Sequence, residues 1–187
     1  MGDIASIGDK VRITVLTDGS GAIEEVEKRE RAIVRLDPRP QGDYQQVLLA
    51  NADQAVFVFA CAHPNPRLRM LDRFLVIAEK QKIPAIIVAN KIDLVDDPKE
   101  IFGLYETIGY RVLYTSTKTG AGIEELKSIL TGTASPVSAF AGPSGAGKSS
   151  LLNAMQPGLG LAVNEVSRAV NKGKHTTVTR QLFPLEG

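Results

Sequence analysis

The glycine-rich run at residues 142–150, Gly-Pro-Ser-Gly-Ala-Gly-Lys-Ser-Ser, has residue types and spacing suited to binding phosphate. A strand-like apolar segment precedes this run and a helical pattern follows it. In such a P-loop the glycines let the backbone curl so that successive N–H groups point at phosphate oxygens. The positive end of the following helix adds to the attraction. Lys148 would reach the terminal phosphates, and the Ser149 hydroxyl would bind a magnesium ion. The alternative is a plain glycine-rich turn. The predicted phosphate-binding residues are Gly142, Pro143, Ser144, Gly145, Ala146, Gly147, Lys148, Ser149 and Ser150.

The motif Asn90-Lys91-Ile92-Asp93 follows an apolar run and has the chemistry to distinguish guanine from adenine. Asp93 can accept two hydrogen bonds from the N1–H and N2–H₂ groups of guanine, whereas adenine offers no such pair of donors. Asn90 can brace the loop and contact the base, and the stem of Lys91 can cover the face of the base. An ordinary turn at a strand end has similar residues, so the motif alone leaves both interpretations open.

The segment Thr-Ser-Thr-Lys-Thr-Gly-Ala-Gly at residues 115–122 resembles the loop that closes over guanine in GTPases. The backbone N–H near Thr117 would contact the base carbonyl, with Ser116 and Lys118 in support. Alone, the segment is also compatible with a turn that starts a helix. Both base-reading loops precede the phosphate loop, the reverse of their order in most GTPases. A circularly permuted chain can nevertheless build the same site.

The stretch Asn-Lys-Gly-Lys-His-Thr-Thr at residues 171–177 is a candidate switch loop. A hydroxyl of Thr176 or Thr177 could complete the coordination of magnesium and sense the terminal phosphate. His175 could position the attacking water or stabilise transferred charge. A basic, solvated surface loop is the alternative, and chemistry alone favours that alternative for His175.

The elements around these motifs alternate regularly between strand and helix from residue 54 onward. Continuous apolar runs are typical of parallel strands that are covered on both faces. The alternation predicts an α/β fold of the P-loop NTPase kind, with an open, mostly parallel sheet and helices on both faces. Ligands bind beyond the carboxyl ends of such strands, where the motifs discussed above fall. The expected strands are residues 55–60, 85–89, 110–115 and 137–141, and the expected helices are residues 68–78, 99–107 and 122–130.

The N-terminal part of the chain is predicted to consist of strands. Residues 10–15 alternate polar and apolar side chains, residues 18–21 suit a turn, and residues 22–34 can return as a second strand. Two or three strands are not a stable unit alone, so they either pack on the next domain or belong to a small barrel. The predicted division is a partial OB-like β segment at residues 1–36, a linker at 37–50 and a circularly permuted GTPase domain at 51–187.

Composition is that of a globular chain, with 43% apolar residues and a net charge of +1. This balance neither predicts nor excludes a nucleic-acid partner. The single cysteine, Cys61, excludes an internal disulfide and favours a reducing, cytoplasmic setting. The N-terminus lacks a signal-peptide pattern, and the longest apolar run is too short for a membrane helix. We therefore expect a cytoplasmic protein without a membrane partner.

Taken together, the permuted motif order, the phosphate loop and the Gly-Lys-His-Thr-Thr switch resemble the ribosome small-subunit-dependent GTPase A family. Residues 51–54 and 71–75 extend the resemblance over nearly the whole chain. The family implies a cytoplasmic bacterial GTPase that acts late in small-subunit assembly, with GTP or GDP and Mg²⁺ as ligands and the subunit's rRNA as partner. A monomer is expected. The family also implies a role in hydrolysis for His175.

The resemblance departs from the family pattern at both ends of the chain. The N-terminal segment matches only the latter part of the family's OB barrel, and the sequence ends at Gly187, before the expected Asp-x-Pro-Gly loop. The family's zinc-binding extension is missing, and a lone cysteine cannot rebuild a zinc site. We therefore expect a truncated member that binds guanine nucleotide and has impaired hydrolysis.

Two other functions stay open at the sequence level. One is an ATP-binding P-loop protein, although neither a transport ATPase nor a small kinase explains the motif at residues 90–93. The other is a nucleotide-gated module that docks on ribosomal RNA without useful hydrolysis. For any single basic residue of the N-terminal strands, the solvated face of an edge strand is the favoured interpretation. The candidate phosphate contacts are Lys10, Arg12, Lys28, Arg29, Arg31, Arg35 and Arg39.

Overall fold

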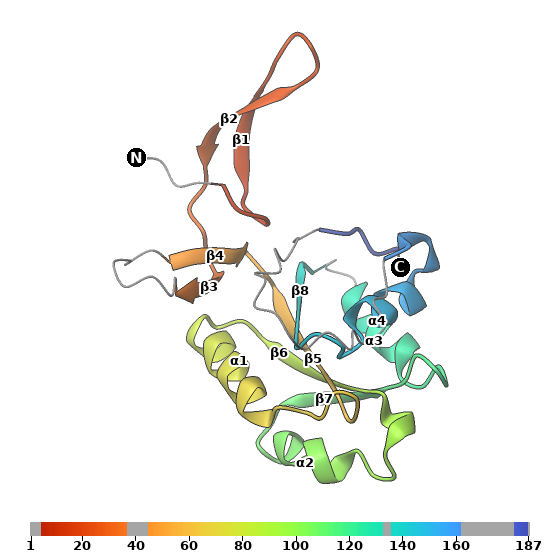
Figure 1. The fold of residues 1–187 in the computed structure, drawn as a ribbon. Coiled ribbons are helices and arrows are strands. Elements are labelled where there is room, and N and C mark those ends of the chain that lie inside the picture. Colours follow the sequence, from red (N-terminus) through yellow and green to blue (C-terminus); the bar gives the residue numbers. More distant parts are fainter. Residues whose placement is uncertain (1–4, 37–44, 133–135, 162–181, 187) are drawn as a thin grey trace, which may run out of the picture.

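A computed structural model describes residues 5–36, 45–132, 136–161 and 182–186 of the chain (Figure 1). In chain order the strands are β1 (Val11–Val15), β2 (Gly21–Val26), β3 (Ala32–Leu36), β4 (Gln45–Ala50), β5 (Gln54–Ala60), β6 (Ala85–Asn90), β7 (Arg111–Thr115) and β8 (Ser138–Ala141). The helices are α1 (Leu68–Lys80), α2 (Lys99–Thr107), α3 (Ile123–Leu130) and α4 (Lys148–Met155). Within these described residues, no helix has the length and apolar character needed to cross a membrane.

A parallel sheet with the strand order β7-β6-β5-β8 forms the body that carries the motifs. The central strand β5 pairs in parallel with β6 on one side and with β8 on the other. Successive residues of a strand face opposite sides of the sheet. Accordingly Phe57 and Phe59 pack on the face covered by α1 and α2, while Val56 and Val58 pack on the face covered by α3 and α4. The α/β fold with an open parallel sheet is therefore confirmed.

The four N-terminal strands form two separate antiparallel pairs, β1 with β2 and β3 with β4. The expectation of one strand over residues 22–34 is wrong, because β2 and β3 are distinct strands with different partners. The segment 37–50, predicted as a linker, contains β4 in its second half. That prediction rested on the prolines and glycine near residue 40, whereas apolar residues follow them and pair with β3.

Asn51 and Asp53 connect the N-terminal strands to the parallel sheet. The amide nitrogen of Asn51 donates to the carbonyl of Gly8, and its amide oxygen accepts from the backbone N–H of Glu30, both at 3.0 Å. The carboxylate of Asp53 accepts a hydrogen bond from the backbone N–H of Val137 at 2.9 Å, just before β8. The same carboxylate lies 3.5 Å from the guanidinium of Arg31. These contacts join β8, which leads into the phosphate loop, to the segment between β2 and β3.

Candidate nucleotide-binding site

The phosphate loop lies between β8 and α4, at the carboxyl end of the parallel sheet (Figure 1). Two of its glycines are required by close backbone approach. A Cβ atom on Gly142 would collide with the carbonyl oxygen of Val58, and one on Gly147 would collide with the side-chain amide of Asn90. Gly147 also has a φ of +94°, a conformation that favours glycine. The loop therefore lies in close contact with β5 and with the last residue of β6.

Lys148, the first residue of α4, folds its side chain back over the phosphate loop. Its Nζ donates to the carbonyl oxygens of Gly142 and Pro143, each at 2.8 Å. Burial lowers the pKa of Lys148, because an apolar setting disfavours the charged form. An anion in the loop would oppose that shift and give the ammonium group a charge-assisted partner. Lys148 is thus placed to meet phosphate at the start of the helix.

Asn90 joins the three motifs at the carboxyl ends of β6, β7 and β8. Its side chain is 1% exposed. The amide nitrogen donates to the carbonyl of Ala146 at 2.9 Å, and the amide oxygen accepts from the hydroxyl of Thr115 at 3.1 Å. Asn90 and Thr115 are also register partners in the sheet. The side chain of Asn90 therefore links the phosphate loop to the last residue of β7.

Asp93 and Ser116 face each other from the two base-reading loops. The Ser116 hydroxyl donates to the carboxylate of Asp93 at 2.6 Å and accepts from the backbone N–H groups of Lys118 and Thr119 at 3.2 Å. The ammonium group of Lys118 lies 3.9 Å from the other carboxylate oxygen. Because a carboxylate offers about four lone-pair sites, Asp93 keeps acceptor capacity for a base. The serine fixes the direction of the carboxylate.

Lys91 lies in a left-handed backbone conformation with a φ of +61°, directly after β6. Its ammonium group donates to the carbonyl oxygen of His63, in the segment between β5 and α1. Burial lowers the pKa of Lys91, and the nearby charge of Asp93 partly opposes this shift. Its Cε lies 3.9 Å from the position that a Cβ atom on Gly147 would occupy. The aliphatic stem therefore runs along the phosphate loop.

The remaining predicted site residues differ in how far the structure describes them. Ser144 and Thr117 are exposed, while Ser149 and Ser150 are half-buried in the first turn of α4. Mg²⁺ prefers oxygen ligands and is usually shared with substrate phosphates, so the Ser149 hydroxyl beside the glycine cradle fits this ion. In the part of the chain that is described, no cluster of three or more His, Cys, Asp or Glu side chains could hold a metal. The predicted residues His175, Thr176 and Thr177 lie outside the described residues.

The arginines of the N-terminal strands, considered above as RNA contacts, face carboxylates. Arg12 lies 3.0 Å from Glu25, and Arg31 lies 3.5 Å from Asp53. Arg29 donates from two nitrogens to Asp9, both at 2.8 Å, and this hydrogen bonding holds the pKa of Asp9 below its ordinary value. Lys10 and Lys28 are exposed, and the side chains of Arg35 and Arg39 lie outside the described residues. For the three arginines described, a paired surface position is the better interpretation.

Comparison with known proteins shows that the sequence of this chain is similar to those of GTPases. The family model described as RsgA GTPase matches residues 26–187. The chain is 44% identical to a small ribosomal subunit biogenesis GTPase RsgA of Moorella thermoacetica, over 95% of this chain and 57% of that protein. It is also 44% identical to the protein of that name from Gemmatimonas aurantiaca, over 96% of this chain and 59% of that protein. The chain thus spans a little over half the length of these relatives.

Two solved structures resemble this fold. The crystal structure of YjeQ from Thermotoga maritima matches with a TM-score of 0.66 and 38% identity, covering 86% of this chain and 54% of that one. The structure of YloQ, described as a circularly permuted GTPase, matches with a TM-score of 0.57 and 34% identity, covering 83% and 52%. The likeness supports the permuted order of strands and motifs deduced from the sequence.

Proposed function

This chain belongs to the RsgA GTPase family, and from that premise we propose that it binds guanine nucleotide and hydrolyses GTP. We further propose that it acts in the maturation of the small ribosomal subunit, the process for which its relatives are named. The subunit and its rRNA are the proposed partners. We propose that the chain binds them as a monomer in the cytoplasm. Residues 51–187 would form the permuted GTPase domain, and the antiparallel strands of residues 1–36 would belong to an OB-like barrel.

The observation that carries this proposal is the bridge made by Asn90. One buried amide bonds to Ala146 in the phosphate loop and to Thr115 at the start of a base-reading loop. A nucleotide has to contact the phosphate loop and the base-reading loop at the same time. The distance between these two loops therefore decides which ligands fit. Loops that are already held in place also lose less conformational freedom when the ligand binds. The bridge therefore supports a single site for base and phosphates.

Guanine selection is assigned to Asp93, oriented by Ser116. Guanine would donate two hydrogen bonds to the carboxylate, whereas adenine has no such pair of donors and would leave the acceptor sites that face the base unsatisfied. The hydrogen bond from Ser116 at 2.6 Å keeps one face of the carboxylate occupied and turns the rest toward the base. This arrangement favours guanine nucleotide over the alternative of an ATP-binding P-loop protein.

At the phosphate end, the loop N–H groups and the N-terminus of α4 would bind oxygens, and Lys148 would offset their charge. Bound Mg²⁺ would supply further charge neutralisation, held by Ser149 and by Thr176 or Thr177. His175 is proposed to position the attacking water. The proposal for His175 and the two threonines rests on the sequence motif alone, since those residues are outside the described part of the chain.

Competition between fluorescent GDP and unlabelled GDP or ADP tests nucleotide choice. We expect GDP to displace the probe at concentrations about 100-fold lower than ADP, because leaving a buried polar group unsatisfied costs about 1–3 kcal/mol. The Ser116→Ala variant should reduce this preference for GDP over ADP, because Asp93 loses the hydroxyl group that orients its carboxylate. Equal displacement by ADP would reject the guanine site.

Single-turnover GTP hydrolysis, with and without purified small ribosomal subunits, tests the reaction and the partner together. We expect measurable release of phosphate that increases when subunits are present. Normal GDP binding without hydrolysis under either condition would instead support the non-enzymatic docking module.

A further inference from the structure

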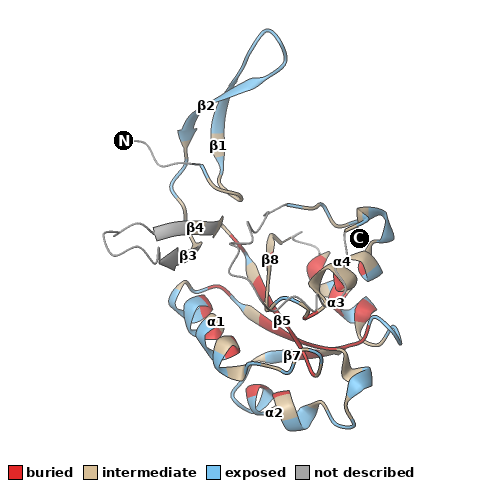
Figure 2. Ribbon diagram, viewed as in Figure 1, coloured by how far each residue is buried: buried red, intermediate tan, exposed pale blue. Residues whose placement is uncertain are grey.

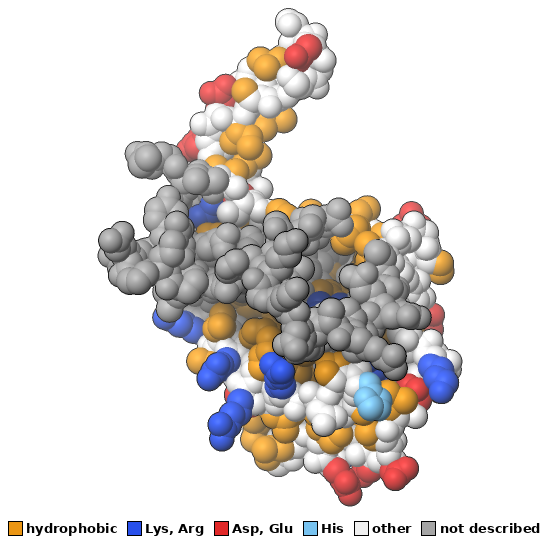
Figure 3. Space-filling view, viewed as in Figure 1, with side chains coloured by type: hydrophobic (Ala, Val, Ile, Leu, Met, Phe, Trp, Pro, Cys, Tyr) orange, Lys and Arg blue, Asp and Glu red, His pale blue; other side chains and the backbone are white. Residues whose placement is uncertain are grey.

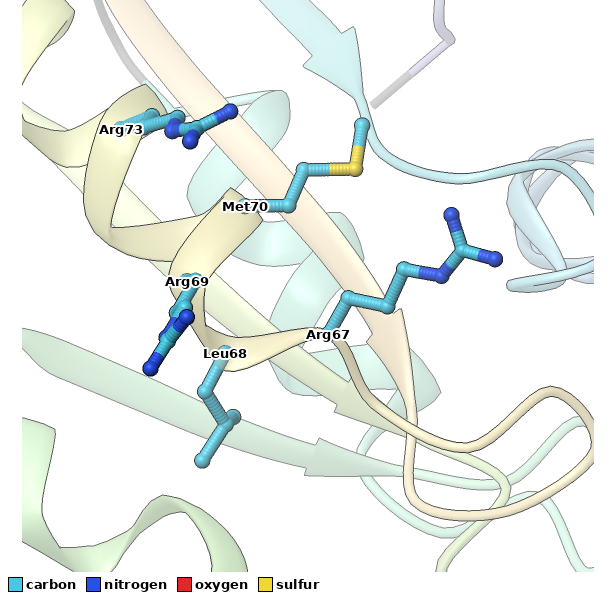
Figure 4. Close-up of a pocket in the computed structure, with 5 residues that line it drawn as sticks. All are labelled: Arg67, Leu68, Arg69, Met70 and Arg73. Carbon is cyan, nitrogen blue, oxygen red and sulfur yellow. The ribbon is translucent and has the colours of Figure 1, made fainter.

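A basic surface covers the exposed side of α1 and the residue before it. Figure 3 shows Lys and Arg side chains gathered over the region of this helix. Among the described residues, a cavity of about 470 Å³ at the start of α1 is lined by Arg67, Leu68, Arg69, Met70 and Arg73 (Figure 4). Within the described chain, none of these three arginines forms an ion pair with a carboxylate.

The carboxylates of α1 are held away from its arginines by tyrosines. The carboxylate of Asp72 accepts a hydrogen bond from the hydroxyl of Tyr105 on α2 at 2.7 Å. The carboxylate of Glu79 accepts from the hydroxyl of Tyr110, just before β7, at 3.2 Å. Burial, followed by these hydrogen bonds, raises the pKa of both tyrosines, so the hydroxyls remain donors at neutral pH. The negative charge of the helix is thereby directed toward α2 and β7.

Helix geometry separates the two charges further. With about 100° between successive residues, Arg69, Arg73 and Lys80 fall within about 40° of one another around α1. Asp72 and Glu79 fall about 60–80° to one side of Arg69, toward the tyrosines. Val76, 67% exposed, and Ile77, 37% exposed, flank these cations, about 20° and 40° around the helix from the nearest of them. The outward face of α1 is therefore a row of cations with exposed apolar side chains and no described carboxylate partner.

We propose that the α1 surface formed by Arg69, Arg73 and Lys80 binds the phosphate backbone of small-subunit rRNA. The inference rests on the proposed function, since the small ribosomal subunit is the RNA-containing partner invoked there. Guanidinium groups bind phosphates in bidentate fashion and also stack on unpaired bases, which single-stranded RNA segments expose. Arg69 and Arg73 are separated by about 6 Å along the helix axis, so both can contact one RNA strand.

The contrast with the N-terminal arginines favours α1 as the RNA surface. Arg12, Arg29 and Arg31 already face carboxylates, and moving them to a phosphate would deprive those carboxylates of their cationic partners. The α1 arginines have no such described partner to give up. Their positive charge is therefore available to release counterions from a polyanion, which is the main source of affinity for nucleic-acid backbones.

The test compares two charge-removing variants of the full chain in binding to purified small ribosomal subunits at several salt concentrations. In the Arg69→Gln/Arg73→Gln double variant, affinity should depend less steeply on salt. The slope of log affinity against log salt should become less negative by about 1.5, because two phosphate contacts are lost. The Arg12→Gln control removes an exposed but paired arginine and should leave the slope unchanged. Both variants should bind fluorescent GDP as the unchanged chain does, which verifies their fold.

Three results would overturn the proposal. The double variant could keep the salt slope of the unchanged chain, or the unchanged chain could fail to bind subunits at low salt. A poly-glutamate peptide could compete with the subunits as well as a short RNA does, which would assign the surface to an acidic protein. The first and third results leave the proposed function intact, because GDP preference and GTP hydrolysis are measured without reference to α1. Failure of the unchanged chain to bind subunits would also reject the proposed partner, whereas loss of GDP preference or of hydrolysis would leave the α1 surface untouched.

Discussion

The N-terminal strands and the parallel sheet differ in what holds them together. In the parallel sheet, β5 and β6 are buried on both faces and helices cover them; in the β1–β2 hairpin, side chains are exposed (Figure 2). Ile13 and Val15 are 53% and 71% exposed. The hairpin is held by strand hydrogen bonds and ion pairs, which contribute little individually. The comparison teaches that the buried core and the proposed nucleotide site lie in the sheet and its helices, while the N-terminal strands carry locally satisfied charge.

Truncating one large apolar side chain in each region gives the largest expected difference. Phe59→Ala should destabilise the chain by about 3–5 kcal/mol, because a fully buried ring is replaced by a cavity between β5 and α1. Ile13→Ala should cost less than about 0.5 kcal/mol, since that side chain is mostly exposed. Urea unfolding followed by circular dichroism measures both. Similar losses in the two variants would show that the hairpin is buried against something else.

Removing one lysine from each region compares their parts in nucleotide binding. Lys148→Ala should weaken GDP binding by about 100-fold, because the phosphates lose their main cationic partner. Lys28→Ala removes an exposed cation of the N-terminal segment and should leave GDP affinity unchanged. Titration of a fluorescent GDP analogue measures both affinities. An unchanged affinity in Lys148→Ala would contradict the assignment of the phosphate loop.

A carboxylate-to-amide change in each region is expected to have a smaller effect. Asp93→Asn should weaken GDP binding by about 10-fold or more and reduce the preference for GDP over ADP, because one acceptor becomes a donor. Asp18→Asn, in the β1–β2 turn where Asp18 accepts from Ser20, should affect neither quantity. Competition between GDP and ADP for the same fluorescent probe provides the measurement. If the Asp93→Asn variant kept its preference for GDP over ADP, groups other than Asp93 would have to recognise the base.

The smallest expected effect concerns the partly buried ion pair between Arg29 and Asp9 in the N-terminal region. The pKa of Asp9 lies below its ordinary value, chiefly because Arg29 donates hydrogen bonds to the carboxylate. A carboxyl with a lowered folded-state pKa contributes stability above its unfolded pKa of about 3.9, and loses it as pH falls through the folded value. NMR titration should find the Asp9 midpoint below the ordinary value of an aspartate, and Arg29→Gln should raise it. A midpoint that stays the same in Arg29→Gln would mean that the pair contributes nothing to this region.

The strands of the parallel sheet could be predicted from the sequence because burial on both faces requires uninterrupted apolar residues. Residues 85–89 were expected as a strand and form most of β6, and the helix expected at residues 99–107 matches α2. Topology then placed the motifs at one edge of the sheet. The N-terminal strands were less predictable, because their length and pairing depend on distant partners such as β4.

Side-chain pairing was not predictable from the sequence for a similar reason. The pattern identified Asn90 as part of a recognition loop, but its bond to Ala146 exists only after residues 56 positions apart are folded together. In the same way, the sequence contained many candidate cations for RNA and no sign of which faced carboxylates. Arg29 and Asp9, for example, are 20 positions apart. The α1 arginines differ from the N-terminal arginines in having no described carboxylate partner, and this difference is a property of the fold and not of the sequence pattern.

The bridge at Asn90 has a consequence for how binding energies combine at this site. Groups that share one hydrogen-bond network have non-additive mutational effects. Substitutions in the phosphate loop and in the base-reading loops therefore have to be measured together, because each changes the background against which the other acts. Guanosine alone would contact only the base-reading loops, and pyrophosphate alone would contact only the phosphate loop. Each fragment would therefore use only one half of a cooperative unit. In the proposed site, the affinity for the intact nucleotide would be a property of that unit and not a sum over its loops.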